Sequence, residues 1–394
     1  MSVHASIRFA PPRALMRGLL VIVFVCGLLF GLGLLGPESR ERSMGGLLMG
    51  FVHAVSITVA GGLFLAVLRL SNARWATALR RLPEALAASL PVLGFLALIL
   101  IGGVPLLYDW SHESHVLGDP ILEGKSDYLN WFAFGVRSIV FFLVWTWLMR
   151  GMVAHSRRQD ADGDARHRAA MFKYAACFMP VLAVTYSLAS VDWVESLEPH
   201  WFSTAFALVT LSGAACSALA ACVLLGLWLR KRGELRRAFT DDHLDDLGKI
   251  TIGFALFWGY IWFCQYMLVW YTNMPEETPY YALRLNGGWG HVAKLCILLC
   301  WAVPFFVLMP KRARRSAAVM GRVAVVVLVG QATHWYWLIG PVVIGEHPAF
   351  GMWDLAPVVG SLALLAWGVL RRLSEAPIVP LRDPALEESL HYHC

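Results

Sequence analysis

The stretch GGLLMGFVHAVSITVAGGLFLAVLR, residues 45–69, decides the class of fold. Its only charged side chain is the terminal Arg69, and the run is longer than the roughly 20 residues that a helix needs to cross about 30 Å of hydrocarbon. The chain as a whole is 58% hydrophobic and 15% charged, which is more apolar surface than a soluble domain of 394 residues can bury. The sequence therefore predicts a membrane protein.

Further apolar runs on both sides of this stretch are also long enough to span a bilayer. The ten predicted spans cover residues 16–36, 45–69, 86–108, 128–150, 170–192, 201–229, 246–271, 287–309, 318–340 and 349–371. The first follows Arg13 and Arg17 and has no small-residue cleavage site, so we expect a retained helix rather than a removed signal peptide. The expected fold is an all-α polytopic membrane protein, with residues 1–394 forming a single integral membrane domain.

Basic side chains are concentrated in every second loop. They occupy the N-terminus, the C-terminal tail and the stretches 69–81, 150–173, 230–237 and 311–315, whereas the alternate loops hold Arg40, Arg42, Lys125 and Arg284. By the positive-inside rule, both termini and the tail 373–394 are expected in the cytoplasm. The net charge of +6 is therefore a topology signal, and we expect the lipid bilayer as a partner and no nucleic acid.

A weak internal repeat relates the two halves of the chain. RRLPEALAASLP, residues 80–91, is similar to DDHLDDLGKITIG, residues 241–253, and the two segments enter the third and seventh predicted spans. An offset of four helices gives parallel repeats, so we expect two four-helix bundles, residues 45–192 and 201–340, with the first and last spans outside them. Coincidence between apolar helices is the alternative.

Polar side chains inside a membrane are costly, so each one is a candidate functional residue. Arg137 and Lys294 are expected to be buried cations with an anionic partner or a wet cavity. For a lone His or Gln, an ordinary interhelical hydrogen bond is the alternative. The candidate proton path contains His53, Arg137, Gln265, His291, Lys294, His334 and Asp354 in the spans, Asp192, Glu195, Glu198 and His200 at an outer mouth, and Asp245, Asp246 and Lys249 at a cytoplasmic entrance.

The stretch SVDWVESLEPHWFS, residues 190–203, concentrates carboxylates and a histidine between two apolar runs. Such groups at a boundary can pass protons one at a time, because burial and mutual repulsion separate their pKa values. Alternatively, Glu198, Pro199 and His200 cap the start of the following helix. The two interpretations are compatible.

No motif for a bound cofactor is readable in the chain. The helix histidines are too few and unpaired for transmembrane haem, and there is no Walker loop, GxGxxG or CxxC series. The terminal HYHC, residues 391–394, could bind a metal weakly, but a disordered tail is the favoured interpretation. We therefore expect no catalytic residue and no metal site, and any redox centres would lie in partner subunits.

Four blocks of sequence carry a resemblance to a known family. They are LFLAVLRLSNARWATALRRLPEAL (63–86), YDWSH (108–112) with KSDYLN (125–130) and Arg137, SVDWVESLEPHWFST (190–204), and DLGKITIGFALFWGYIWFCQYMLVWYTNMPEET (246–278). These blocks resemble the F-type membrane subunit of bacterial alternative complex III, a quinol:cytochrome c oxidoreductase. That family is similar to the wider group of NrfD or polysulfide reductase C type proteins, which are built from two four-helix bundles.

The resemblance implies a subunit of a quinol-oxidising respiratory complex in the bacterial inner membrane. Its implied partners are an NrfD-like paralogue, subunits that carry iron–sulfur clusters and haem c on the non-cytoplasmic side, and a terminal oxidase. Quinone or menaquinone is the candidate ligand, with its binding residues unknown, and the expected role is proton conduction, quinone binding or both. The alternative is a stand-alone secondary transporter, although Pro91 and Pro105 in the third span have no counterparts in the seventh.

Overall fold

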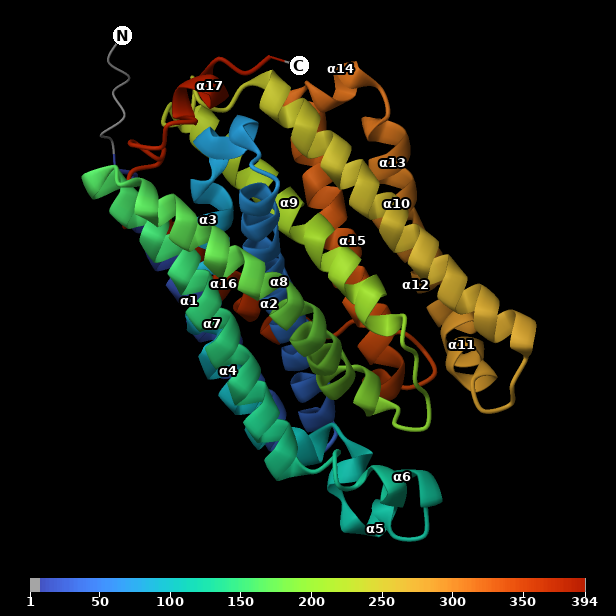
Figure 1. Ribbon diagram of the computed structural model, residues 1–394. Coiled ribbons are helices and arrows are strands. Elements are labelled where there is room, and N and C mark those ends of the chain that lie inside the picture. Colours follow the sequence, from blue (N-terminus) through green and yellow to red (C-terminus); the bar gives the residue numbers. More distant parts are fainter. Residues whose placement is uncertain (1–7, 394) are drawn as a thin grey trace.

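The computed structural model describes residues 8–393, and within them every regular element is a helix, apart from one isolated bridge between Arg8 and Pro377. Ten helical spans are long and apolar enough to cross a membrane, which confirms the predicted all-α polytopic fold (Figure 1). Their elements are α1 (Arg13–Leu35), α2 (Arg40–Leu70), α3 with α4 (Arg81–Ala87, Leu90–Gly102), α7 (Trp131–Asp162), α8 (Ala165–Trp193), α9 (Phe206–Arg232), α10 (Asp241–Thr272), α12 with η5 and α13 (Gly287–Ile297, Leu298–Ala302, Val303–Leu308), α15 (Ala317–Ile344) and α16 (Met352–Leu373).

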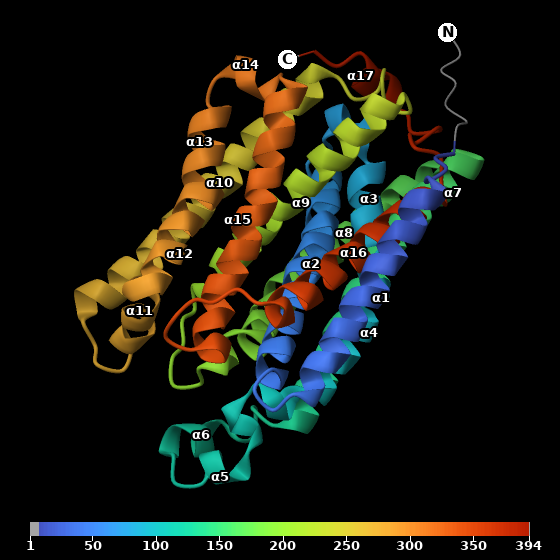
Figure 2. The same ribbon diagram turned by 180° about the vertical axis from the view of Figure 1, so that it is seen from behind.

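Short helices lie at the two ends of this bundle. They are η1 (Arg74–Leu79), η2 (Val104–Leu106), η3 (Asp109–Ser111), α5 (Glu113–Val116), α6 (Pro120–Lys125), η4 (Glu195–Leu197), α11 (Thr278–Leu285), α14 (Lys311–Arg314) and α17 (Leu386–Leu390). Figures 1 and 2 show α14, α17 and the turn between α7 and α8 at one end, and α5, α6 and α11 at the other.

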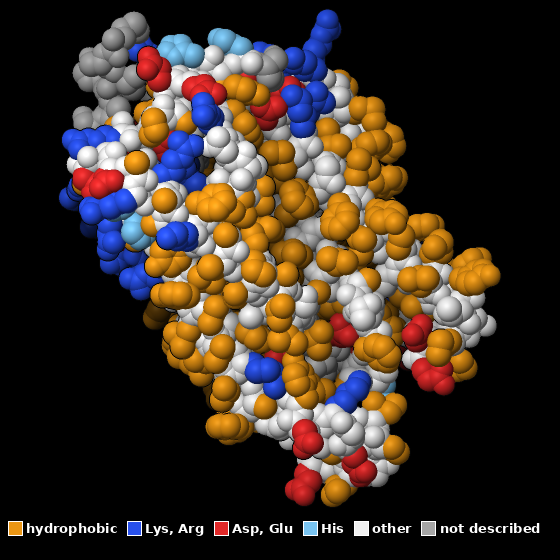
Figure 3. All heavy atoms as spheres, viewed as in Figure 1, with side chains coloured by type: hydrophobic (Ala, Val, Ile, Leu, Met, Phe, Trp, Pro, Cys, Tyr) orange, Lys and Arg blue, Asp and Glu red, His pale blue; other side chains and the backbone are white. Residues whose placement is uncertain are grey.

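The two ends differ in charge as the sequence predicted. We call the end formed by residues 70–81, 150–173, 230–241, 308–317 and 374–393 the basic end, and the end formed by residues 103–130, 194–205 and 273–286 the acidic end. In Figure 3 hydrophobic side chains cover the middle of the molecule, and Lys and Arg gather at the upper left, over the basic end. The assignment of the basic end to the cytoplasm stays a prediction.

The helix α2 is the centre of the packing. Every residue from 43 to 62 is buried, and α2 contacts α8, α9, α15 and α16. Gly46 and Gly50 allow the close approach of α16: a Cβ at these positions would come within 2.6 Å of the Asp354 carbonyl oxygen and 2.8 Å of the Val358 Cα. Small residues four apart are a common device for close helix pairs in membranes. The division into two four-helix bundles stays a prediction.

Helix boundaries differ from the predicted ones where backbone chemistry interrupts or extends a run. The third span breaks at Ala88–Ser89 and ends at Gly102, six residues before the predicted end, because Gly103 and Pro105 do not continue the helix. The eighth span contains the π-turn η5 just before Pro304, whose ring nitrogen has no hydrogen to donate. By contrast, α7 continues twelve residues past its predicted end.

The C-terminal tail packs against the basic end before the HYHC segment, and the expected disorder of HYHC stays a prediction. The Ser389 hydroxyl donates to the Trp75 carbonyl oxygen and accepts from the Ala78 N–H at 3.0 Å, which attaches α17 to η1. Asp383 is buried and forms an ion pair with Arg80. These partners are distant in the sequence, so the composition of the tail does not reveal them. Cys394 lies outside the described residues.

Candidate functional site

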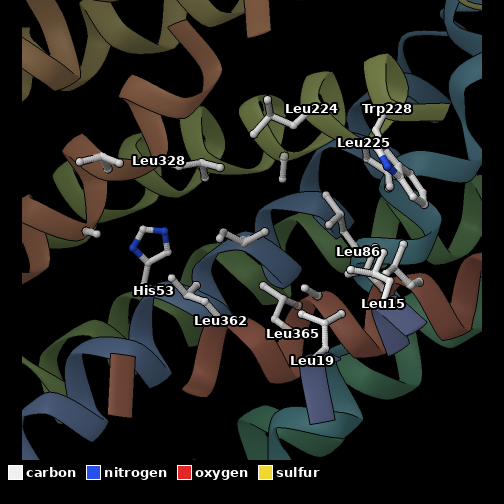
Figure 4. A pocket seen from close by; sticks show the side chains of 17 residues that line it. Leu15, Leu19, His53, Leu86, Leu224, Leu225, Trp228, Leu328, Leu362 and Leu365 are labelled. Carbon is white, nitrogen blue, oxygen red and sulfur yellow. The ribbon is translucent and has the colours of Figure 1, made fainter. Parts of the chain in front are cut away.

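A cavity of about 510 Å³ lies among five of the long helices and α3, and it is lined almost entirely by carbon (Figure 4). The one titratable side chain in its lining is His53 of α2. The lining residues are Leu15, Leu19, His53, Ile57, Leu86, Ala221, Leu224, Leu225, Trp228, Leu328, Val329, Ala332, Leu362, Leu365, Ala366, Val369 and Leu370.

His53 stands at one end of this cavity, and Leu15, Leu86 and Trp228 stand at the other (Figure 4). At 1.5 Å per residue it is roughly 20 Å along α2 from Arg40 and roughly 26 Å from Leu70, so it lies near the middle of the helix. The cavity therefore extends from the middle of the bundle towards the basic end.

The His53 ring has no hydrogen-bond partner among the described residues. The residue is 2% exposed, and its Nδ1 is buried without a donor or acceptor in reach. Leaving a buried polar group unpaired costs free energy, typically about 1–3 kcal/mol. A histidine that carries this cost at the end of an apolar cavity is suited to a ligand with one polar group and a long apolar body.

The cavity opens on one side towards the membrane. Its lining includes Leu15 of α1, which is 39% exposed, and Val329 of α15, which is 52% exposed. In Figure 2, α1 and α15 lie on either side of α2 and α16. The exposed lining residues Leu15 and Val329 place the open side of the cavity between α1 and α15. An apolar molecule dissolved in the bilayer could enter here without crossing water.

A second group of buried polar atoms lies between α10 and α15. Both ring nitrogens of His334, the Gln331 Nε2 and the indole nitrogens of Trp258 and Trp262 are buried without hydrogen-bond partners. The His334 ring is 5.1 Å from the Trp258 ring and perpendicular to it. Buried polar groups are normally satisfied by protein or by ordered water, so this concentration of groups without a protein partner makes the surroundings of His334 a candidate functional region.

Next to the acidic end, Arg137 of α7 and Asp192 of α8 form an ion pair that the sequence did not predict as a pair. The Arg137 Nε and Nη2 donate to the two Asp192 carboxylate oxygens at 2.8 and 3.1 Å. The guanidinium also stacks on the Tyr128 ring, 3.8 Å from its centroid. Burial, with a smaller effect of the Asp192 charge, raises the pKa of Tyr128 to about 12. The anionic partner that we expected for Arg137 is therefore present.

The other residues of the predicted outer mouth have separate partners. Glu195 accepts from the Ser203 N–H at 2.9 Å, Glu198 pairs with Arg284, and His200 pairs with Asp119 at 2.6 Å. The hydrogen bond with His200 is the main cause that lowers the pKa of Asp119. The alternative role of residues 198–200 as a helix cap is wrong, because α9 begins at Phe206.

At the basic end, the predicted entrance residues lie together. The Lys249 ammonium is 2.9 Å from Asp245 and 2.8 Å from Asp246. Arg314 donates to Asp245 at 2.7 Å, and the Tyr392 hydroxyl donates to Asp246 at 2.6 Å. The carboxylates are thus held by cations and by the tail.

Two expectations about depth are wrong. Lys294 is exposed on α12, as is His291 one turn away, because the face of α12 that carries them points out of the bundle and Ala293 and Cys296 point in. Asp354 lies in the first turn of α16, where it accepts from the Gly351 N–H at 3.0 Å and pairs with Arg42. Gln265 is buried on α10, as expected.

The structure groups most of the candidates in three places: the acidic end, the core around His53 and His334, and the basic end. No hydrogen bond described for residues 8–393 joins one group to the next, so a continuous path stays a prediction. Sequence reasoning missed Arg284, which is 1% exposed, and the buried cluster of Arg80, Arg81 and Glu84. The aromatic pair Tyr280–Tyr281 just before Arg284 was the available signal, because the guanidinium stacks on the Tyr280 ring at 3.7 Å.

The chain matches no protein-family model and no curated protein. The family therefore stays the expectation drawn from the four sequence blocks.

Proposed function

We propose that the chain is a quinone-binding membrane subunit of a quinol-oxidising respiratory complex of the alternative complex III type, without a redox centre of its own. The observation that carries this proposal is the cavity at His53. Its volume is within the range typical of small-molecule sites, which are mostly apolar with a few placed polar groups.

The residues of the cavity fit a quinone in two respects. A neutral imidazole has one N–H, and His53 could donate it to a ring carbonyl of the quinone. The leucines that continue from His53 to Trp228 provide an apolar channel for an isoprenoid tail. The chain's own contribution would be to bind and orient the ring, and the opening between α1 and α15 admits it from the bilayer.

The acidic end supports the proposed assembly with redox subunits. Helices α5 and α6 project beyond the long helices and α11 lies beside the ends of α10 and α12 (Figure 1). Asp109, Glu113 and Glu276 are exposed at this end. An acidic surface attracts basic partner surfaces, and this attraction weakens with salt. We propose that the iron–sulfur and c-type cytochrome subunits dock at this end.

Filling the cavity tests the proposed site. Ala366→Phe adds a ring to the lining, and we expect the binding of decylubiquinone to the purified protein to weaken by roughly tenfold or more, because overpacking leaves no room for the ligand. His53→Leu keeps the cavity and removes one hydrogen bond worth about 0.5–1.5 kcal/mol, so binding should weaken only a few-fold. Binding is measured by displacement of a fluorescent quinone analogue.

The matched control is Ala176→Phe, which makes the same change on the exposed face of α8. It should bind decylubiquinone as the unchanged protein does. Equal affinity for Ala366→Phe and Ala176→Phe would show that quinone does not bind in this cavity.

A second function, proton conduction, is favoured by the unpartnered groups around His334. An imidazole with two free nitrogens can accept a proton at one and release it from the other. We propose that His334 and Gln331 form the central part of a proton path, with Asp245 and Asp246 at one end and Asp192 at the other.

A further inference from the structure

A groove runs along the seam between α7 and α8 at the basic end. It consists of two adjoining depressions of about 420 and 580 Å³, which share His155 and Arg158. The first is lined mainly by one face of α7, from Leu143 to Arg158, with Tyr174 of α8. The second continues to the turn between the two helices. This groove is separate from the His53 cavity and shares no lining residue with it.

The position of the groove corresponds to the boundary between hydrocarbon and headgroups. The uncharged part of α7 after Arg137 ends at Met149, and the helix from Trp131 to Met149 is roughly 28 Å long, close to the thickness of the hydrocarbon. Arg150 is the next residue, so the helix length places its guanidinium at the level expected for lipid phosphates. Leu143 and Trp147, which line the groove on the hydrocarbon side of Arg150, are 63% and 64% exposed.

The groove has uncompensated positive charge. Arg150 and Arg158 are exposed, and neither forms an ion pair or hydrogen bond with any described residue. Asp162 is the one carboxylate in the lining, and it is engaged by His167 at 2.8 Å and by Arg166 at 3.5 Å. In Figure 3 the basic side chains at the upper left include those over this end of α7 and α8.

The wall of the groove is formed by aromatic side chains that pack against one another. Tyr174 packs edge-to-face with Trp147, their ring centroids 5.9 Å apart, and its ring is 5.8 Å from that of His155. Gly151 allows this, because a Cβ there would lie 2.4 Å from the Tyr174 ring. His155 and His167 are joined through their Nδ1 atoms at 2.9 Å, which fixes the inner end of the wall.

We propose that this groove binds an anionic phospholipid. The phosphodiester accepts hydrogen bonds from Arg150 and Arg158, whose planar guanidinium groups suit phosphate oxygens, and an acyl chain lies over Leu143 and Trp147. Basic pockets between helices at this membrane depth are typical sites for anionic headgroups. Exposed apolar residues on the hydrocarbon side and unpaired arginines on the headgroup side match the two parts of one lipid molecule.

The experiment is native mass spectrometry of the purified, delipidated protein titrated with phosphatidylglycerol, with phosphatidylcholine and inorganic phosphate as separate probes. We expect Arg150→Gln/Arg158→Gln to weaken phosphatidylglycerol binding by about tenfold or more, because each basic residue near an anionic lipid contributes several-fold. The variant Arg150→Lys/Arg158→Lys keeps both charges and should retain most of the affinity.

The matched control is Arg312→Gln/Arg322→Gln, which removes two exposed, unpaired arginines from α14 and α15 near the same end. It should leave phosphatidylglycerol binding within about twofold of the unchanged protein, as expected for general surface charge. The proposal would be overturned if Arg150→Gln/Arg158→Gln and Arg312→Gln/Arg322→Gln lost phosphatidylglycerol binding equally. It would also be overturned if phosphatidylcholine bound as tightly as phosphatidylglycerol, or if inorganic phosphate alone saturated the site. Both arginine pairs are exposed, so we expect all variants to fold, and an unchanged unfolding temperature confirms this.

Discussion

Replacing Arg137 by methionine is expected to lower the free energy of unfolding by about 3–5 kcal/mol, because it leaves the Asp192 carboxylate buried without its cation. The Asp192 side chain is 0% exposed, and both of its oxygens accept from Arg137. The measurement is unfolding of the purified protein in mixed micelles with increasing denaturant.

The double variant Arg137→Met/Asp192→Leu removes both charges, and it should recover most of the lost stability, since a buried pair can be replaced by apolar groups at little cost. The control Arg322→Met removes an exposed arginine and should change the unfolding free energy by less than about 0.5 kcal/mol. If the double variant is as unstable as Arg137→Met, burial of an unpaired carboxylate is not the cause.

Replacing His334 by leucine is expected to reduce proton movement per electron by roughly tenfold or more in vesicles that contain the assembled complex, while quinol oxidation continues. The physical reason is that His334 is the titratable group in the middle of the bundle with two free nitrogens. Leucine should be accepted at this position, because the histidine makes no hydrogen bond that would be lost. Proton movement is followed with an internal pH dye and quinol oxidation by absorbance.

Thr333→Val is the control for this experiment, since the Thr333 hydroxyl bonds only to the Val329 carbonyl oxygen of its own helix at 2.9 Å. It should leave the ratio of protons to electrons unchanged. A proportional fall of proton movement and quinol oxidation in His334→Leu would contradict a separate proton path and assign the residue to the quinone site or to assembly.

The ten spans could be predicted because each contains a long, mostly apolar run with few charges, and hydrophobicity alone reports such runs. The ends of the helices were harder to predict from the sequence. Averaged hydropathy ends the predicted span at Arg150, because the apolar run ends there. The helix α7 itself continues to Asp162. The break at Ala88–Ser89 and the π-turn before Pro304 depend on local backbone chemistry, which an average over a window hides.

For the candidate site, the sequence identified His53, Arg137 and Asp192 as costly polar residues but not their surroundings. Which residues meet depends on how helices far apart in the chain pack, so the Arg137–Asp192 pair and the cavity at His53 could not be read from spacing. Lys294 was misplaced for the same reason: α12 is apolar on most of its surface, and composition does not tell which face points inward. Arg284 was treated as a loop residue although it is buried.

Affinity purification of the tagged chain from its native membrane tests the central claim most directly. The eluate is examined for c-type haem by absorbance, for iron–sulfur clusters by electron paramagnetic resonance, and for quinone by extraction. We predict that haem c, iron–sulfur subunits and quinone elute with the chain in fixed ratio and that salt at about 1 M, where the Debye length is about 3 Å, releases part of the redox subunits. A chain that elutes alone, without haem or quinone, would contradict the respiratory assignment and favour a stand-alone transporter.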